Sequence, residues 1–445
     1  MTAHRNESRT STFLDGLKLM RRIFQLGVGL LAAGALQAAD WPQWRGPNAD
    51  GSWNETGVVK RFPGAKLKRK WSVPIGGGYS GPTVAGGRVF VTDRVENPER
   101  ERVHCVDFES GERLWSYEYG VSYRPISYPA GPRSAVTVDD GRAYAMGAVG
   151  HLHCFDVNSG RLLWSHDCHD EYGIKFEAWG ISASPVVDGD LVIVVIGGRN
   201  ACLVAFDKKT GKEAWRSLSD RSNYSTPIVM EQAGEKVLVA WTGDRIVGLA
   251  LETGKEHWAV PFKPWRMPLG IAAPILHNGL IYITGFYDGS ILLRPHKNKM
   301  EVKTIWRRKG KSERSTDSLH SIISTPVILG EHIYGVDSYG EFRCLELMTG
   351  DRVWEDRTAT PQDRWSTIHF VQNGDTTWMF NERGELIIGD LSPGGFTEIS
   401  RTKLIDPTPK QLRRRLVVWA HPAFADRHVI ARNDRELVCA SLADE

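Results

Sequence analysis

Short runs of alternating or fully apolar residues recur along most of the chain. The run Leu191-Val-Ile-Val-Val-Ile196 is one β-branched example, and turn residues such as Gly, Asn and Asp separate these runs. Period-two alternation and β-branched composition are typical of strands, and glycine-containing breaks are typical of hairpin turns. The pattern predicts an all-β protein of short antiparallel strands.

One segment recurs at a nearly constant interval. Its first copy reads Cys105-Val-Asp-Phe-Glu-Ser-Gly-Glu-Arg-Leu-Trp115. The other copies end at Trp164, Trp215, Trp258 and Trp354, with a degenerate copy before Trp306. These tryptophans are 43 to 51 residues apart, which is a propeller-blade period. The glycine of each Ser/Thr-Gly turn supplies a positive φ, and the tryptophan is expected to pack between neighbouring blades.

Counting the units predicts an eight-bladed propeller of four-stranded antiparallel blades. Six units lie between residues 80 and 357, and a seventh, without the tryptophan, runs from about 366 to 404. Residues 419–442 supply three strands, and the segment around Trp71 supplies the missing fourth. Pairing this N-terminal strand with the C-terminal strands closes the ring and leaves no free edge. The predicted domain is residues 40–445.

The repeat resembles that of pyrroloquinoline-quinone-like (PQQ-like) β-propeller proteins over essentially all of this domain. The opening Asp40-Trp-Pro-Gln-Trp-Arg-Gly-Pro-Asn-Ala-Asp-Gly51 is similar to the N-terminal segment of propellers common in planctomycetes and verrucomicrobia. The resemblance implies the fold shared by the outer-membrane assembly factor BamB and the quinoprotein alcohol dehydrogenases. It implies no single function, because one scaffold hosts many activities.

Residues 1–39 are predicted to be an export signal. Arg21-Arg22 precedes an apolar run from Ile23 to Leu36, and cleavage is expected after Ala38 or Ala39. Met20 is an alternative start, and the sequence leaves open whether the route is the general secretory (Sec) or the twin-arginine (Tat) one. The run is too short to span a membrane, so we expect a periplasmic or secreted protein with no transmembrane segment in the mature chain.

Charge argues against a nucleic-acid partner. Residues 1–39 hold five Lys or Arg and two Asp or Glu, so their removal takes the formal net charge from +3 to zero. The basic clusters 66–70, 307–311 and 413–415 are short and are interpreted as solvated loop charge. A monomer is expected.

The cysteines are expected to be free. One repeat position is occupied by Cys105, Cys154, Cys344 and Cys439, and by Ala205 and Gly248 in other blades. This is a slot for a small buried side chain, and equivalent positions in different blades are too far apart to bridge. No two cysteines are adjacent, whereas the quinoprotein dehydrogenases that the repeat resembles commonly carry a vicinal Cys-Cys ring. This departure favours another function.

No metal site is predicted. His151 and His153 alternate on an expected strand, but His104 and Arg343 share the position of His153, so a solvated strand face is expected. The segment His166-Asp-Cys-His-Asp-Glu171 is interpreted as a polar surface loop, with a Zn²⁺ or Cu²⁺ site as the alternative. PQQ with Ca²⁺ needs carboxylate and amide oxygens around the ion, and no Ca²⁺-loop pattern occurs, so this cofactor pair is retained only as an alternative.

The best candidate site is the axial face, where the connections into the inner strands converge. Several aromatic or cationic residues fall three positions before the inner-strand proline, and two histidines fall one before. The side chains expected to ring the channel mouth are Tyr79, Tyr128, Arg133, Trp179, Tyr224, Arg266, His320, His369, Trp419 and His421. Such a set suits a sugar, an aromatic cofactor or a peptide; alternatively, the rings plug the funnel.

Several functions remain open at this point. A binding or scaffold propeller of the cell envelope, engaging a protein or a small-molecule or carbohydrate ligand at this face, is favoured by the missing cysteine pair, Ca²⁺ pattern and haem motif. A PQQ-dependent periplasmic oxidoreductase of alcohols or sugars is the alternative, supported by the repeat and the Arg-aromatic mouth. A hydrolase or lyase using His, Asp and Arg is a third class.

Overall fold

The structure is a computed structural model that describes Met1 and residues 40–409, 411–412 and 415–444. Its contacts divide the chain into Met1–Ala38 and Ala39–Glu445, and the fold described here is that of the second unit. The predicted export signal lies outside the described residues. No helix among the described residues is long and apolar enough to cross a membrane.

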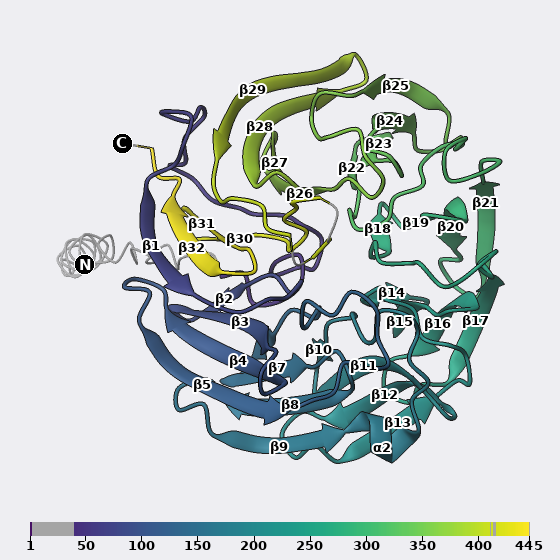
Figure 1. Ribbon diagram of the computed structural model, residues 1–445. Helices are drawn as coiled ribbons and strands as arrows, with labels where there is room; N and C mark the ends of the chain where they lie inside the picture. The colour runs from purple at the N-terminus through teal and green to yellow at the C-terminus, as the bar shows by residue number, and fades with distance from the viewer. Residues whose placement is uncertain (2–39, 410, 413–414, 445) are drawn as a thin grey trace. The chain divides into compact units, whose positions relative to one another are not determined.

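Eight four-stranded sheets follow one another around a ring (Figure 1). In the first three blades the strands are β2 (Thr83–Ala85), β3 (Arg88–Val95), β4 (Arg100–Asp107), β5 (Arg113–Gly120), β6 (Thr137–Asp139), β7 (Arg142–Met146), β8 (His151–Asp156), β9 (Leu162–Asp167), β10 (Val186–Asp188), β11 (Leu191–Gly198), β12 (Ala201–Asp207) and β13 (Glu213–Ser217). Each sheet is antiparallel and keeps chain order from the inner to the outer strand. The predicted all-β propeller is therefore confirmed.

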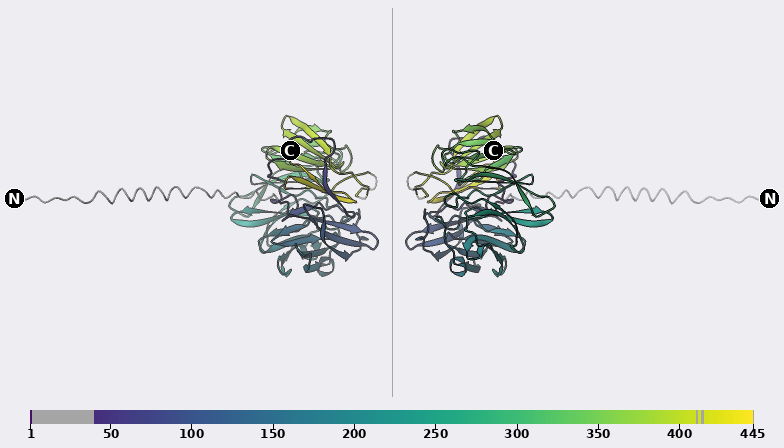
Figure 2. Two further views of the ribbon diagram at one scale, coloured as in Figure 1. Left: turned by 90° about the vertical axis from the view of Figure 1, so that its left-hand side faces the viewer. Right: turned by 90° about the vertical axis from the view of Figure 1, so that its right-hand side faces the viewer.

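The next four blades repeat this arrangement. Their strands are β14 (Ile228–Gln232), β15 (Glu235–Trp241), β16 (Arg245–Ala250), β17 (Glu256–Pro261), β18 (Ile275–His277), β19 (Leu280–Gly285), β20 (Gly289–Pro295), β21 (Val302–Arg308), β22 (Val327–Leu329), β23 (His332–Val336), β24 (Phe342–Glu346), β25 (Arg352–Asp356), β26 (Ile368–Asn373), β27 (Thr376–Asn381), β28 (Glu385–Ser392) and β29 (Gly395–Lys403). Side views show strands throughout (Figure 2), and the one described helix is the short α2 (Cys168–Tyr172).

The eighth blade joins the two ends of the domain. It pairs β1 (Arg69–Pro74) with β32 (Glu436–Ser441), followed inward by β31 (His428–Arg432) and β30 (Ala423–Ala425). Figure 1 shows the purple β1 lying along the yellow β32. Trp71 stands opposite Cys439 in this pair. The predicted closure, which leaves neither strand as an open edge, is confirmed.

Each repeat tryptophan links its blade to the next one. The indole Nε1 of Trp71, Trp115, Trp164, Trp215, Trp306 and Trp354 donates to a backbone oxygen of the following blade at 2.8–3.2 Å. Most of these rings also cover the turn glycine of that blade. A Cβ on Gly211, for example, would lie 2.7 Å from the ring of Trp164. The repeated glycine is therefore needed for its φ of +74° and for the close approach of the ring.

One seam uses a different contact. The fifth blade lacks the Ser/Thr-Gly turn, and Trp258 donates instead to Gln232 Oε1 at 2.9 Å. The amide nitrogen of Gln232 then donates to the backbone oxygens of Lys299 and Glu301. Gln232 thus bridges Trp258 to the fifth blade, whereas the six indoles named above donate directly to a backbone oxygen of the next blade.

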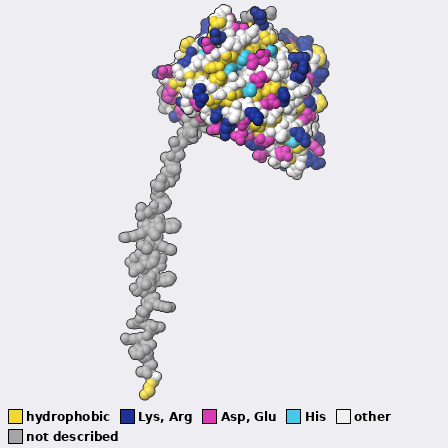
Figure 3. All heavy atoms as spheres, turned by 90° about the horizontal axis from the view of Figure 1, so that it is seen from below, with side chains coloured by type: hydrophobic (Ala, Val, Ile, Leu, Met, Phe, Trp, Pro, Cys, Tyr) yellow, Lys and Arg dark blue, Asp and Glu magenta, His cyan; other side chains and the backbone are white. Residues whose placement is uncertain are grey.

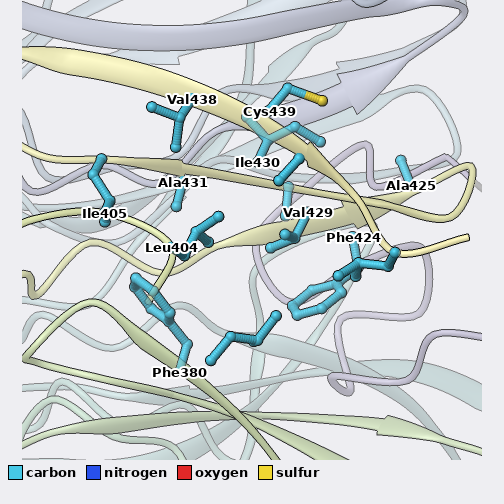
Figure 4. Packing of buried hydrophobic residues seen from close by; sticks show 14 of the residues in the cluster. Phe380, Leu404, Ile405, Phe424, Ala425, Val429, Ile430, Ala431, Val438 and Cys439 are labelled. Carbon is cyan, nitrogen blue, oxygen red and sulfur yellow. The ribbon is translucent and has the colours of Figure 1, made fainter. Parts of the chain in front are cut away.

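The seam between the seventh and eighth blades has no repeat tryptophan and is filled by apolar side chains. Phe380 and Leu404 face Val429 and Phe424 in one buried cluster (Figure 4). This packing compensates for the missing indole.

All six cysteines are free and buried, which confirms the small-residue slot. Cys105, Cys154, Cys344 and Cys439 each stand directly opposite a repeat tryptophan in the neighbouring outer strand. A larger side chain there would meet the indole. At Gly248 in the fourth blade, even a Cβ would lie 2.2 Å from Trp258.

The solvated strand face expected for His104 and His153 is wrong. His104 and His153 are buried rather than solvated, because the rings of Tyr117 and Tyr119 cover His153 and Asp93 lies against His104 at 3.2 Å. The segment after His166 is polar and exposed at His169, Asp170 and Glu171, as expected. It forms the helix α2 rather than a loop, and Asp167 caps this helix by accepting from the amides of His169 and Asp170.

The surface charge is mixed, as the balanced composition predicts. Acidic and basic side chains are interspersed, with a few histidines, over the face seen in Figure 3. The ligand-type atoms of Asp167, His169 and Asp170 lie within 4.8 Å of one another on the surface. Asp167 is already engaged as the cap of α2.

Candidate functional site

The connections into the inner strands enclose a cavity of about 110 Å³ on the axial face. Eight of the ten residues expected at the channel mouth line it: Tyr79, Tyr128, Arg133, Trp179, Tyr224, His369, Trp419 and His421. The remaining lining residues are Trp44, Ser182, Ser184, Thr226, Ile271, Ile322, Ile323 and Trp365. The structure thus brings most of the predicted side chains together.

One repeat position supplies much of the lining. Seven blades each contribute the residue three before the inner-strand proline or its equivalent, at Tyr79, Arg133, Ser182, Tyr224, Ile271, Ile323 and Trp419. Ser182 and the two isoleucines were not predicted, because only aromatic and charged side chains were selected, although all three occupy the same position relative to the inner-strand proline. In the seventh blade, Trp365 lines the cavity instead of the residue at this position.

The aromatic rings form a box around the cavity. Trp179 stacks on Tyr224 at a centroid distance of 5.2 Å, and Tyr79 stacks on Trp419 at 6.5 Å. Trp365 stands between the two pairs, 5.9 Å from Trp179 and 6.2 Å from Trp419. These arrangements are the favoured offset and edge-to-face ones.

Two residues of the box have a left-handed backbone. Tyr128 has a φ of +55° and Trp365 a φ of +69°, and their rings are 5.8 Å apart. Such a backbone is strained for bulky side chains and occurs most often at functional sites. Hydrogen bonds hold both: Arg133 donates to the Tyr128 oxygen at 2.7 Å, and the Trp365 amide donates to Ser338 at 2.9 Å.

Trp44 brings the N-terminal segment into the cavity. This segment is fixed by a bridge between Trp41 and Val84 and by another between Ser52 and Gln372. The Trp44 ring lies 4.3 Å from that of His421, edge to face. The opening motif, residues 40–51, therefore also supplies a wall of the site, which sequence reasoning did not predict.

Both cavity histidines are neutral at pH 7. Burial lowers the pKa of His369 to about 4 and that of His421 to about 3. The Nε2–H of His369 donates to the Trp419 oxygen at 2.9 Å. Nδ1 of His421 donates to the Pro422 oxygen at 3.2 Å, which leaves Nε2 as an acceptor.

Three buried polar atoms of the lining have no hydrogen-bond partner among the described residues. They are the indole Nε1–H groups of Trp44 and Trp365 and the Nε2 of His421. An unpaired buried donor or acceptor costs about 1–3 kcal/mol. Neighbouring atoms cover all three, so a ligand in the cavity would bond to them only after a ring of the lining moves.

Arg133 has a structural engagement as well as a place in the lining. Its guanidinium donates to the backbone oxygens of Gly131, Ser127 and Tyr128 at 2.7–3.0 Å and lies 4.9 Å from the Tyr79 ring. Within the described part of the chain, no carboxylate pairs with it. Its positive charge therefore remains uncompensated beside the cavity.

Two predicted residues lie elsewhere. Arg266 is exposed and covers the ring of Trp265 at 4.6 Å, because its connection turns outward. His320 is fully buried: it accepts from the Gly310 amide and donates to the Phe286 oxygen, each at 3.0 Å. It ties two connections together without facing the cavity.

The lining does not fit PQQ with Ca²⁺. No carboxylate occurs among the described lining residues, and the ion requires several oxygen ligands. Glu382 lies behind Trp419, whose Nε1 is 3.3 Å away, and pairs with Arg415 at 3.0 Å. Burial raises the pKa of Glu382 to about 7. The one cation of the lining, Arg133, already donates to three carbonyl oxygens.

A family model described as outer membrane protein assembly factor BamB matches residues 99–356. The chain belongs to this BamB-type family of PQQ-like propellers. The BamB of Shewanella oneidensis is 23% identical over 36% of this chain and 40% of its own length, and that of Burkholderia pseudomallei is 22% identical over 38% and 47%. The matches thus span about half or less of these curated relatives.

Solved PQQ-like propellers share the fold. BamB from Moraxella catarrhalis superposes with a TM-score of 0.56 at 15% identity, covering 84% of this chain and 99% of that one. A quinohaemoprotein alcohol dehydrogenase from Comamonas testosteroni gives 0.62 at 12% identity, covering 92% and 81%. At such identities the likeness shows the fold alone, so function must be argued from the cavity.

Proposed function

We propose that this PQQ-like propeller is an exported binding or scaffold protein of the cell envelope that holds a ligand or partner group in its axial cavity. The observation that carries the proposal is the lining: an aromatic box with unpaired polar atoms on Trp44, Trp365 and His421 and no carboxylate among its described residues. The similarity to proteins named as outer membrane assembly factors supports the cell-envelope role.

The size and chemistry of the cavity narrow the ligand. An apolar cavity of about 150 Å³ accepts one benzene ring, so this smaller cavity of about 110 Å³ suits one side chain, or one edge of a larger ring. Stacking on the box favours a planar or ring-shaped group. Acceptor oxygens on this group would bond to the indole N–H groups of Trp44 and Trp365 once a movement of the rings uncovers them. The side chain of a partner protein meets these requirements, and a sugar would insert one edge of its ring.

Titration of tryptophan fluorescence tests the proposal, since four tryptophans line the cavity. The protein is titrated with mono- and disaccharides and with short aromatic peptides. We expect saturable binding of at least one probe and about tenfold weaker binding by Trp365→Phe, which keeps a ring but loses one N–H. Trp265→Phe, which removes an indole outside the cavity, is the matched control.

Two results would contradict the proposal. One is no binding of any probe. The other is dye-linked alcohol or sugar oxidation after reconstitution with PQQ and Ca²⁺, which would favour the oxidoreductase. Fractionation of cells that express the full chain, with N-terminal sequencing, tests export: cleavage after Ala38 or Ala39 is expected.

A further inference from the structure

A second concave surface lies on the axial face and differs in chemistry from the cavity. This basic groove, of about 650 Å³, is formed by the connections 262–274, 309–326 and 357–367 together with two hairpin turns. Its charged lining residues are five cations, Arg266, Lys309, Lys311, Arg314 and Arg364, and one carboxylate, Glu313. The groove shares no lining residue with the axial cavity.

Only part of this positive charge is compensated. Glu313 pairs with Arg364 at 2.9 Å, and the buried Asp288 lies 3.4 Å from Lys309. No described carboxylate pairs with the other three cations, Arg266, Lys311 and Arg314, and all three are exposed. The connections 262–274, 309–326 and 357–367 carry formal charges of +2, +1 and +1 in the sequence, and the fold gathers their cations in one groove.

Aromatic rings support two of the unpaired cations. The guanidinium of Arg266 lies 4.6 Å from the ring of Trp265, and that of Arg314 lies 4.6 Å from the ring of Tyr339. Trp265 is 66% exposed. A guanidinium that stacks on a ring keeps its N–H edge free for bidentate bonds to a carboxylate. The groove therefore presents the N–H edges of these two guanidinium groups to a ligand. One face of each aromatic ring is already covered by its cation.

We propose that the basic groove binds an acidic peptide segment of a protein partner. Its cations are spread over three connections, which suits several carboxylates along an extended segment better than a single small anion. Trp, Tyr and Arg together are the composition of protein–protein hot spots. A sugar chain would need free ring faces for stacking, and cations cover faces of Trp265 and Tyr339.

Fluorescence anisotropy tests this proposal. The probes are fluorescein-labelled dodecapeptides of Glu and Asp interspersed with Phe and Leu, with Gln and Asn versions as neutral controls. We expect saturable binding of the acidic peptides, weakened at least tenfold in Arg266→Glu/Arg314→Glu and strongly reduced by salt. The matched control is Arg161→Glu/Lys255→Glu, which reverses two exposed cations in the β-turns of other blades and should bind as the wild type does.

The proposal is overturned if no acidic peptide binds saturably, if the neutral peptides bind equally well, or if both double variants weaken binding alike. It is also overturned if an anionic polysaccharide such as polygalacturonate binds and displaces the peptides. The cavity variant Trp365→Phe should leave peptide binding unchanged, so the groove and the proposed function can fail separately.

Discussion

Arg133 holds its own connection in place as well as lining the cavity. Replacing it by Ala removes the donor to three backbone oxygens, and one of these belongs to the strained Tyr128. We expect Arg133→Ala to lower the free energy of unfolding by about 1–3 kcal/mol. Arg133→Lys should recover only part of this, because an ammonium lacks the planar fork. Urea denaturation measures the free energy of unfolding of both variants. If Arg133→Ala unfolds with the same free energy as the wild type, Arg133 has no structural role and can act only by contacting a ligand.

Glu382 makes stability depend on pH near neutrality. Burial raises its pKa from 4.5 to about 7, so the folded protein holds this proton more tightly than the unfolded chain does. The stabilisation of the folded state by this tighter proton binding is complete below about pH 4.5, and it is lost as the pH rises through about 7. We expect Glu382→Gln to be more stable than the wild type at pH 8, by about 1–3 kcal/mol, and not at pH 4.5.

Thermal melts of the two proteins across this range measure the difference. The neutral buried histidines act in the opposite direction, since their lowered pKa values favour the folded state as pH rises. They are present in both proteins, so the comparison isolates Glu382. Parallel stability curves would show that Glu382 stays ionised.

At the scale of elements, the contact of a tryptophan with a turn glycine joins one blade to the next. Gly211 and Gly279 have matched φ values of +74° and +73°, but a Cβ would meet Trp164 only at Gly211 and nothing within 4 Å at Gly279. We expect Gly279→Ala to cost about 1 kcal/mol from backbone strain alone. Gly211→Ala should cost about 1–3 kcal/mol more, because the ring must move. If chemical denaturation shows the same loss of unfolding free energy for both variants, the Trp164 ring moves aside at no cost.

The strands and turns were largely predictable because the residues that make this contact, a turn glycine and a tryptophan, recur at a regular spacing in the sequence. The Gly-to-Trp spacing marks the turn and the outer strand of most blades, and the proline register marks the cavity. Chemistry at single positions was less predictable. His153 was expected in solvent because the sequence does not show that tyrosines of the neighbouring blade cover it. Trp44 was missed because only the folded ring brings residue 44 beside residue 421.

At the scale of the whole molecule, ring closure depends on β1. A chain that begins at Gly76 lacks both β1 and the N-terminal segment, so β32 becomes an open edge. We expect its melting temperature to fall by on the order of 10 °C or more. A chain that begins at Phe62 keeps β1 but lacks Trp44, and should lose clearly less. If the two truncations melt alike, the loss comes from the N-terminal segment and not from closure.

The position of the site on the axial face could be predicted from the sequence, but the hydrogen bonding and charge of its side chains could not. Convergence of the inner connections follows from propeller topology, so an axial cavity could be expected. Whether its polar atoms are paired depends on side-chain geometry, as Arg133 shows by donating to carbonyls of its own connection. The gathering of Arg266 and Arg314 in one groove likewise required three separate connections to be placed in space.

The pairing of β1 with β32 also sets an order of assembly. Arg69 and Glu436, which pair across this sheet, are 367 residues apart. A ribosome delivers the chain from its N-terminus, so β1 must wait without its partner while seven blades form. Only a chain synthesised through β32 can seal the ring. Prematurely ended copies would keep an open edge.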